Sequence, residues 1–241
     1  MKIPIIALHS IEPFVQESHD VSSINFDYLC STLRVHDFET ITFTDLLLYF
    51  DKGLPLPEHP VILTSDDGYA NLYNEAYSIL QDYDFVMTVF LTTSFIGEDE
   101  ANRKINKFDE HVVGIPIRKM LIWEEVREMH KNGIEFMSHS VTHSRPEKFT
   151  EEDALFELES SMETIQFYLG SEVPFIAWPF NTVYNDAKKL LKRVGYKGAV
   201  MYKGGIEDTE TMDLGAIKRI PIMGTTDIRS YCSLIGVEDE S

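Results

Sequence analysis

The sequence predicts an α/β fold in which helices cover a sheet of parallel strands. Two observations carry this prediction: short runs rich in Ile, Val and Phe alternate with longer segments, and those segments place apolar residues three or four positions apart. Continuously apolar runs are typical of strands that are buried on both faces. The number of such units in 241 residues favours a closed β/α barrel over an open sheet.

The expected strands recur along the whole chain. They cover Ile3–Leu8, Thr40–Phe43, Val61–Thr64, Phe85–Leu91, Ile134–Met137, Phe175–Trp178, Gly198–Met201 and Ile217–Ile222. Helical spacing is clearest at Phe26, Leu29 and Leu33 and over Leu155–Leu169. No repeat or Pro/Gly/Ser-rich linker interrupts the pattern. We therefore expect one domain over residues 1–235 and an acidic tail over 236–241.

Composition and charge exclude several classes of protein. With 44% hydrophobic residues the chain can bury a large core, which excludes a disordered protein. A net charge of −19 argues against a nucleic-acid partner, because phosphates bind basic surfaces. The two cysteines cannot form a four-sulfur zinc site. No apolar stretch reaches the roughly 18 residues that a membrane span needs.

Two further segments lead to expectations about location and access. Residues 1–9 lack the long apolar region of a secretory signal, so we expect a cytoplasmic protein, or a secreted or periplasmic one if a leader was removed. Residues 96–120 form a long polar connection with several basic side chains, for which we favour a solvated surface insertion over a lid.

Polar residues gather where the expected strands end. His9, the segment 65–69, the segment 138–143 and the segment 179–181 each follow an apolar run. Because the carboxyl ends of parallel strands meet at one edge, these residues should come together at one rim of the barrel.

Asp66 and Asp67 form an unusual pair at the end of a buried strand. Buried carboxylates must be hydrogen-bonded, paired or metal-bound, and two adjacent side chains point in different directions. One could bind a metal while the other takes a proton from water. The alternative is a turn that caps the following helix, a role that Asp fills well.

His139 and His143 lie four residues apart, so both imidazoles reach one metal if the segment is helical or tightly turned. A zinc peptidase would need Glu after the first histidine, where this chain has Ser140. One Asp and two His are three ligands of a zinc-like ion that hydrolyses an amide or ester. The remaining histidines are interpreted as structural: His19, His36, His59, His111 and His130.

These motifs resemble those of the polysaccharide deacetylase family, also called the NodB homology or carbohydrate esterase 4 family. Thr64–Tyr69 is similar to its first motif, Ser138–His143 to its second and Ala177–Phe180 to its third. Ile5–Ile11, Leu121–Gly133 and Arg219–Ile220 resemble segments of the branch that deacetylates the biofilm polymer poly-N-acetylglucosamine.

The resemblance implies a distorted (β/α) barrel of about seven parallel strands. It also implies a divalent metal, with zinc expected and cobalt, manganese, nickel or iron as other candidates. A metal-bound water would attack the acetamide of an N-acetylated sugar in a polysaccharide or glycan precursor, and the metal and a backbone N–H near Phe180 would hold the oxyanion. By the same resemblance, Asp67, His139 and His143 bind the metal, Asp66 is the base, His9 protonates the amine, and Tyr69, Trp178 and Phe180 contact substrate.

Departures from the family pattern leave other interpretations open. Ser65 replaces a Phe, the Arg that often opens the third motif is missing, and no Leu-x-His motif closes the chain near residues 214–222. One alternative is a magnesium-dependent glycosyl or phosphoryl transferase, and another is an inactive carbohydrate-binding homologue. If the substrate is a nucleotide- or lipid-linked precursor, basic residues between Arg103 and Lys119 would contact its diphosphate.

Overall fold

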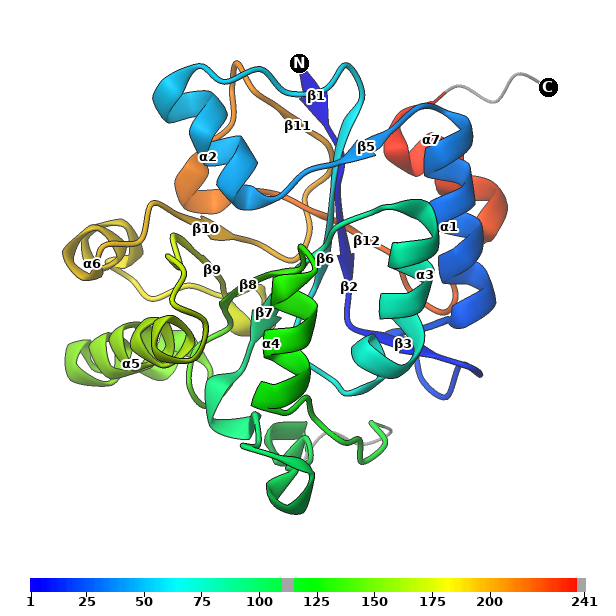
Figure 1. Cartoon of the computed structure of the whole chain (residues 1–241). Coiled ribbons are helices and arrows are strands. Elements are labelled where there is room, and N and C mark those ends of the chain that lie inside the picture. Colours follow the sequence, from blue (N-terminus) through cyan, green and yellow to red (C-terminus); the bar gives the residue numbers. More distant parts are fainter. Residues whose placement is uncertain (110–114, 238–241) are drawn as a thin grey trace.

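The protein is built around one curled sheet of seven parallel strands, as Figure 1 shows for the computed structural model. The structure describes residues 1–109 and 115–237. In spatial order, the strands are β10 (Gly198–Val200), β9 (Phe175–Ala177), β8 (Glu135–Ser138), β7 (Thr88–Leu91), β6 (Pro60–Ser65), β2 (Ile5–Leu8) and β12 (Ile220–Pro221). The sequence prediction of a distorted (β/α) barrel in a single domain is confirmed.

The curl of the sheet brings its two edges close together. A parallel bridge joins Val200 in β10 to Ile217, three residues before β12 begins. Smaller strands lie beside this sheet. They are β5 (Glu39–Thr40), which pairs with β6, the antiparallel pair β1 (Lys2–Ile3) and β11 (Glu207–Asp208), and the parallel pair β3 (Ser10–Glu12) and β4 (Asp20–Ser22).

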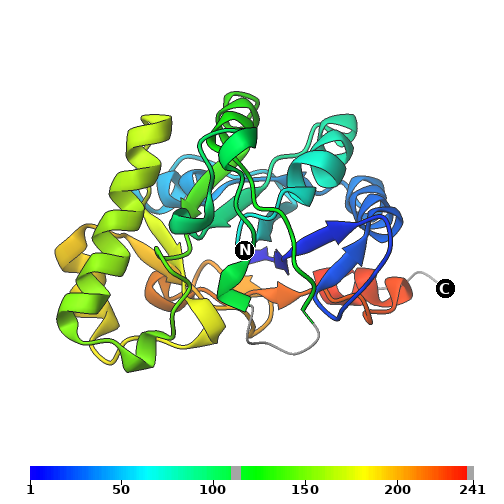
Figure 2. The same ribbon diagram turned by 90° about the horizontal axis from the view of Figure 1, so that it is seen from below.

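Helices lie around the outside of the curled sheet (Figure 2). The longer ones are α1 (Ser23–Val35), α2 (Phe43–Lys52), the π-helix η1 (Leu72–Ala76), α3 (Tyr77–Tyr83), α4 (Trp123–Lys131), α5 (Glu151–Leu169), α6 (Ala187–Val194) and α7 (Tyr231–Ile235). Single 3₁₀ turns are η2 (Thr93–Phe95), η3 (Glu100–Asn102), η4 (Lys107–Asp109), η5 (Pro146–Lys148), η6 (Pro179–Asn181), η7 (Leu214–Ala216) and η8 (Ile228–Ser230). Among the described residues, no helix is both long and apolar enough to span a membrane.

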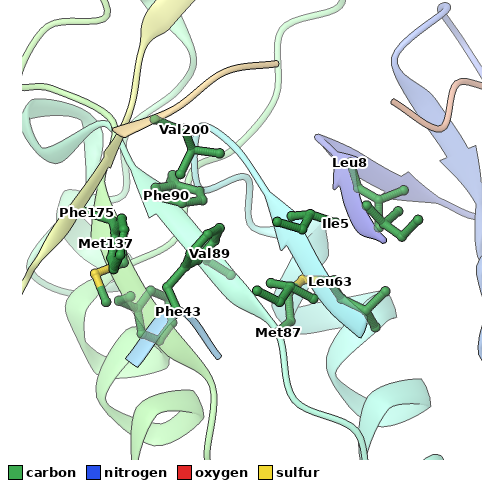
Figure 3. Packing of buried hydrophobic residues seen from close by; sticks show 14 of the residues in the cluster. Ile5, Leu8, Phe43, Leu63, Met87, Val89, Phe90, Met137, Phe175 and Val200 are labelled. Carbon is green, nitrogen blue, oxygen red and sulfur yellow. The ribbon is translucent and has the colours of Figure 1, made fainter. Parts of the chain in front are cut away.

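One expected strand is wrong in its second half. β5 ends at Thr40, and Phe43 begins helix α2 instead of extending the strand. The cause is a capping box, in which the Thr42 side chain accepts from the backbone N–H of Asp45 and the Asp45 carboxylate accepts from that of Thr42. The Phe43 ring still enters the core, where its centroid lies 5.1 Å from that of the Phe175 ring. Figure 3 shows both side chains among the packed core residues.

The described part of the 96–120 segment is folded onto the body of the protein, which corrects our expectation of a solvated insertion. Arg118 is buried, and its guanidinium lies 2.5 Å from the Asp20 carboxylate. Arg103 lies 2.7 Å from Glu125 at the start of α4. These ion pairs fasten the segment at two points. His111 and most of the expected acidic tail lie outside the described residues.

Candidate active site

A cavity of about 480 Å³ opens at the carboxyl ends of the strands. That volume suits a small-molecule or sugar-sized group. All of the strand-end residues singled out in the sequence line it: His9, Asp66, Asp67, Tyr69, His139, His143, Trp178 and Phe180. The expectation that these distant segments meet at one rim is therefore correct.

Asp67, His139 and His143 form a compact set of metal-ligating groups. Their ligand atoms all lie within 4.8 Å of one another. The Asp67 Oδ1 atom is 3.4 Å from the Nε2 atoms of both histidines. Two imidazoles and one carboxylate match the donor set of catalytic zinc sites, which leave a coordination position open. The residues present therefore fit a divalent ion of the zinc type.

Residues 139–143 reach this arrangement through a tight turn and not through a helix. Ser140 and His143 adopt left-handed φ angles of 68° and 57°. Glu157 in α5 holds the turn, because its carboxylate accepts the backbone N–H groups of Val141 and Thr142 at 2.8 and 2.9 Å. Two histidines four residues apart thus face each other without a helix, because the buried Glu157 carboxylate accepts the backbone N–H groups of the turn.

Hydrogen bonding and burial prepare the two histidines to act as ligands. The Nδ1 atom of His139 lies 2.8 Å from the carbonyl oxygen of Ala177, so Nδ1–H donates to it and Nε2 faces Asp67 with its lone pair. Burial lowers the pKa of His139, and it lowers that of His143 well below the ordinary value. Both imidazoles are thus neutral at neutral pH, which is the form that binds a metal.

Asp66 is kept ionised by Arg219. The two guanidinium NH groups donate to the two carboxylate oxygens at 2.7 Å each, and both side chains are almost completely buried. Burial alone raises the pKa of Asp66, but the charge and hydrogen bonds of Arg219, together with the neighbouring His139 and His9, outweigh it and hold the pKa well below its usual range. Arg219 also donates to the Thr64 hydroxyl and to the Met201 carbonyl, which fixes its position.

Sequence analysis did not predict the contact between Arg219 and Asp66. The contact is made by an arginine that directly precedes β12. The available signal was a charged residue inside the otherwise apolar run Ile217–Ile222. A fully buried arginine needs an anionic partner, so that run could have pointed to Asp66 or Asp67.

His9 faces Asp66 from the neighbouring strand β2. Its Nε2 atom is 4.0 Å from Asp66 Oδ2, and solvent reaches about 20% of its side chain. Burial lowers the pKa of His9 to about 4, although the Asp66 charge opposes that shift. His9 is therefore neutral at neutral pH unless a proton is delivered to it.

The three aromatic residues lie in the pocket wall but are largely covered. Tyr69 and Trp178 are each only 3% exposed. The Phe180 ring contacts His143, with 4.7 Å between ring centroids, and carries the Arg145 guanidinium 4.1 Å from its centroid. The indole Nε1–H of Trp178 has no acceptor among the described residues. Contact of these residues with a sugar remains a prediction.

Several pocket residues were not predicted. They are Glu17, His19, Ile115, Arg145, Tyr202 and Lys203, whereas Asn181 belongs to the expected segment 179–181. His19, which we interpreted as structural, also lines the pocket, because the parallel pairing of β3 with β4 turns the connecting residues back toward it. Spacing in the sequence could not show this fold-back. His36, His59 and His130 do not line this pocket.

The basic residues of the 96–120 segment do not reach the pocket. Ile115 is its only described residue in the lining. Arg103 and Arg118 are engaged by acidic side chains, and Lys104 donates to the Ser94 carbonyl. These three side chains are therefore not available to a diphosphate, whereas Lys107 and Lys119 are exposed.

The barrel and its Asp/His/His cluster define the class of the protein. The sequence profile of the family described as polysaccharide deacetylase matches residues 53–199, more than half of the chain. The chain therefore belongs to the polysaccharide deacetylase family, as its motifs predicted.

Individual relatives are about a quarter identical to this chain over the aligned residues. It is 24% identical over 204 residues to YxkH of Bacillus subtilis, whose name places it among polysaccharide deacetylases, and 85% of this chain is aligned. It is 26% identical over 192 residues to the poly-beta-1,6-N-acetyl-D-glucosamine N-deacetylase of Staphylococcus aureus, with 75% aligned. The chain spans 66% and 60% of the length of these two relatives.

Solved structures confirm the fold over nearly the whole chain. The deacetylase PplD of Streptococcus pyogenes, solved in complex with acetate, superposes with a TM-score of 0.81 at 21% identity, covering 98% of both chains. IcaB from Ammonifex degensii superposes with a TM-score of 0.78 at 16% identity, covering 97% of this chain and 95% of that one.

Proposed function

We propose that this protein is a metal-dependent carbohydrate N-deacetylase that removes acetyl groups from an N-acetylated sugar of a polysaccharide or glycan precursor. One observation carries the proposal: a single pocket joins a three-ligand metal set to a carboxylate that a buried arginine keeps ionised. A divalent ion held by Asp67, His139 and His143 supplies Lewis-acid activation of water and of the substrate carbonyl.

Asp66 is the general base in this proposal. The positive charge of Arg219 stabilises the ionised carboxylate of Asp66. Asp66 also adjoins Asp67 in the turn that follows β6. An ionised carboxylate beside the reacting water accepts the proton that the water loses on attack. The same ion pair orients the carboxylate, since both of its oxygens are held. The N–H groups near Phe180 are the proposed backbone donors to the oxyanion.

His9 is the proposed general acid. It lies 4.0 Å from Asp66 and lines the pocket, so a protonated His9 ring is placed to give its proton to the departing amine. Protonation is necessary because an amide nitrogen leaves poorly as an anion. Trp178 is proposed to donate its indole N–H to a substrate oxygen, since that group is buried without an acceptor among the described residues.

The name of the Staphylococcus aureus relative suggests the kind of substrate to test first. That protein acts on poly-beta-1,6-N-acetyl-D-glucosamine by its name, so oligomers of this polymer are the proposed first substrate class. A magnesium-dependent transferase is disfavoured, because magnesium prefers oxygen ligands and two of the three groups here are imidazoles. An inactive homologue is disfavoured because all three proposed ligands and the arginine-paired Asp66 are present in one pocket.

The proposal is tested by measuring acetate release from β-1,6-linked N-acetylglucosamine oligomers with zinc or cobalt present. Asp66→Asn should reduce acetate release roughly 10²–10⁴-fold while metal binding is retained. Undiminished release by Asp66→Asn would remove the proposed base. Asp208→Asn, at an exposed carboxylate near the N-terminus, is the matched control and should leave release unchanged.

A further inference from the structure

The lining of the pocket contains a histidine and a carboxylate that have no part in the proposed reaction, namely His19 and Glu17. Residues 13–19 connect β3 to β4, and Glu17 and His19 from this connection line the cavity. The His19 ring lies beside that of His9, with 5.1 Å between ring centroids and an angle of 56° between the planes. The Tyr202 ring contacts His9 at the same centroid distance from another side.

Glu17 fixes the orientation of the His19 ring. The His19 Nδ1 atom lies 3.1 Å from Glu17 Oε2, and the backbone N–H of His19 donates to the same oxygen at 2.8 Å. Although burial opposes it, hydrogen bonding from His19 lowers the pKa of Glu17 to about 2. Glu17 is therefore ionised at neutral pH, and an ionised acceptor at Nδ1 keeps the proton on that nitrogen.

Arg118 holds this arrangement from the far side. Its guanidinium lies 3.7 Å from Glu17 Oε1, 2.5 Å from Asp20 Oδ1 and 3.2 Å from Glu12 Oε1. These three carboxylates come from β3, β4 and the residues between them, whereas Arg118 is about a hundred positions further along the chain. The connection is thus clamped at both ends and not left as a free loop.

The difference in exposure between His19 and His9 indicates in which direction a proton would move between the two rings, from the more exposed to the less exposed one. Solvent reaches about 37% of the His19 side chain but about 20% of the His9 side chain, which lies deeper beside Asp66. His9 is neutral at neutral pH, yet the proposed reaction needs a proton from it in each turnover. A partly exposed imidazole in ring contact with His9 can take that proton from solvent and pass it inward.

We propose that His19, oriented by Glu17, is a positioning residue for His9 and the route by which His9 regains a proton after each turnover. This inference rests on the proposed function of His9 as the general acid. In the step itself, the protonated His19 ring gives one proton to neutral His9, directly or through one water, and His19 then takes a proton from solvent. No bond to carbon forms or breaks, and the protein returns to its starting protonation.

The charged and titratable groups that face this pair belong to several elements. Glu17, Tyr202 and Arg118 surround His19, the last through Glu17. Those acting on His9 are Asp66, His19, Arg219 and His139. The pH dependence of the reaction will therefore reflect the titration of all these groups together. Substitution of His19 is needed to separate its contribution from that of the others.

The first experiment compares two kinds of substrate in the zinc-loaded protein. An N-acetylated sugar oligomer releases an amine that must be protonated, whereas 4-nitrophenyl acetate releases a phenolate that needs no proton. We expect His19→Gln to lower kcat for the amide about tenfold or more, to leave kcat for the ester within about twofold, and to be partly rescued by added imidazole. Equal losses on both substrates, or no loss on either, would overturn the proposal.

Two further variants sharpen this comparison. Glu17→Gln should reproduce the effect of His19→Gln on the amide in a weaker form, because it removes orientation and not the imidazole. His59→Gln is the matched control, since His59 is exposed and lies outside the pocket. It should change neither substrate.

A second experiment needs no turnover. Histidine ring resonances of the metal-free protein are followed by NMR against pH, and His19→Gln should move the midpoint of His9 upward by roughly half a pH unit, because two imidazolium charges about 5 Å apart repel each other. An unmoved midpoint would overturn the inference. Failure of the proposed function would look different: the wild-type protein would release no acetate from any N-acetylated sugar, with the coupling between the two rings intact.

Discussion

Two buried carboxylates at opposite ends of the sheet show how partners decide what a buried acid can do. Asp66 follows the carboxyl end of β6 and is held by one cation, Arg219. Glu135 begins β8 at the amino end and is held by neutral donors, namely the backbone N–H groups of Phe43 and Thr44 and the hydroxyls of Thr44 and Thr88. Burial raises the pKa of Glu135, whereas Arg219 and the neighbouring His139 and His9 together overcome burial and lower the pKa of Asp66.

A cavity accompanies each carboxylate, and the two cavities are similar in size. The one beside Asp66 measures about 480 Å³ and the one beside Glu135 about 540 Å³. Volume therefore does not distinguish them. Glu135 satisfies the first N–H groups of α2, which is a structural role, while Asp66 adjoins a metal-ligand set. The chemistry of the surrounding groups, and not the space, locates the site.

Removal of the metal should give the largest difference between the two ends. Incubation with a chelator should bring acetate release down to background, since the Asp/His/His cluster then supplies no Lewis acid. Addition of zinc or cobalt should restore it. The measurement is acetate release together with metal content, and full activity in a protein shown to be metal-free would contradict the proposed role of the cluster.

Substitution of Arg219 should have the next largest effect. Arg219→Met leaves Asp66 buried without its cation, so we expect a loss of about 3–5 kcal/mol in the free energy of unfolding and of roughly 10²-fold or more in acetate release. Chemical denaturation and the acetate assay measure the two effects. The double variant Arg219→Met/Asp66→Asn should recover part of the stability, and a double variant less stable than the single one would contradict the pairing.

At the other end of the sheet, Glu135→Gln should affect stability and not activity. The amide cannot accept from all of the donors that face Glu135, so the free energy of unfolding should fall by about 1–3 kcal/mol. Acetate release at a temperature where the protein stays folded should remain within about twofold. A loss comparable to that of Asp66→Asn would mean that both ends of the sheet take part in the reaction.

Acid should act on the two ends in opposite directions. The folded pKa of His9, about 4, lies below its unfolded value, so its stabilising contribution is complete above about pH 6.5 and is lost as pH falls toward 4. The folded pKa of Glu135 is raised, so its contribution is present at low pH and lost as pH rises through that pKa. Both groups are neutral where they stabilise the fold.

Urea unfolding at pH 7 and pH 4.5 measures these contributions. His9→Gln should lose less stability than the wild type between the two pH values, by about 1–2 kcal/mol after allowing for the exposed part of the ring. Glu135→Gln should lose slightly more than the wild type, because the gain from protonating Glu135 is absent. Identical pH dependence in all three proteins would contradict both assignments.

The sequence predicted the residues at strand ends well and their connections poorly. Continuous apolar runs located β2, β6, β8 and β9, and the parallel arrangement then placed the Asp and His motifs at one rim. The strand predicted over Thr40–Phe43 is wrong beyond Thr40, because the capping box at Thr42 starts helix α2 in spite of the apolar pattern. Arg219 and His19 were missed because their roles depend on pairing between distant segments, which no local period encodes.

β12 pairs with β2, so a strand from the last part of the described chain lies beside one from the first part. His9 follows β2 and Arg219 precedes β12, while the three proposed metal ligands lie between these two residues in the sequence. A chain emerging from the ribosome therefore presents its ligands long before the guanidinium that locks Asp66 has been synthesised. The proposed base therefore gains its cationic partner only after all three proposed ligands have been translated, and a protease cut ahead of Arg219 would remove that partner without touching a single ligand.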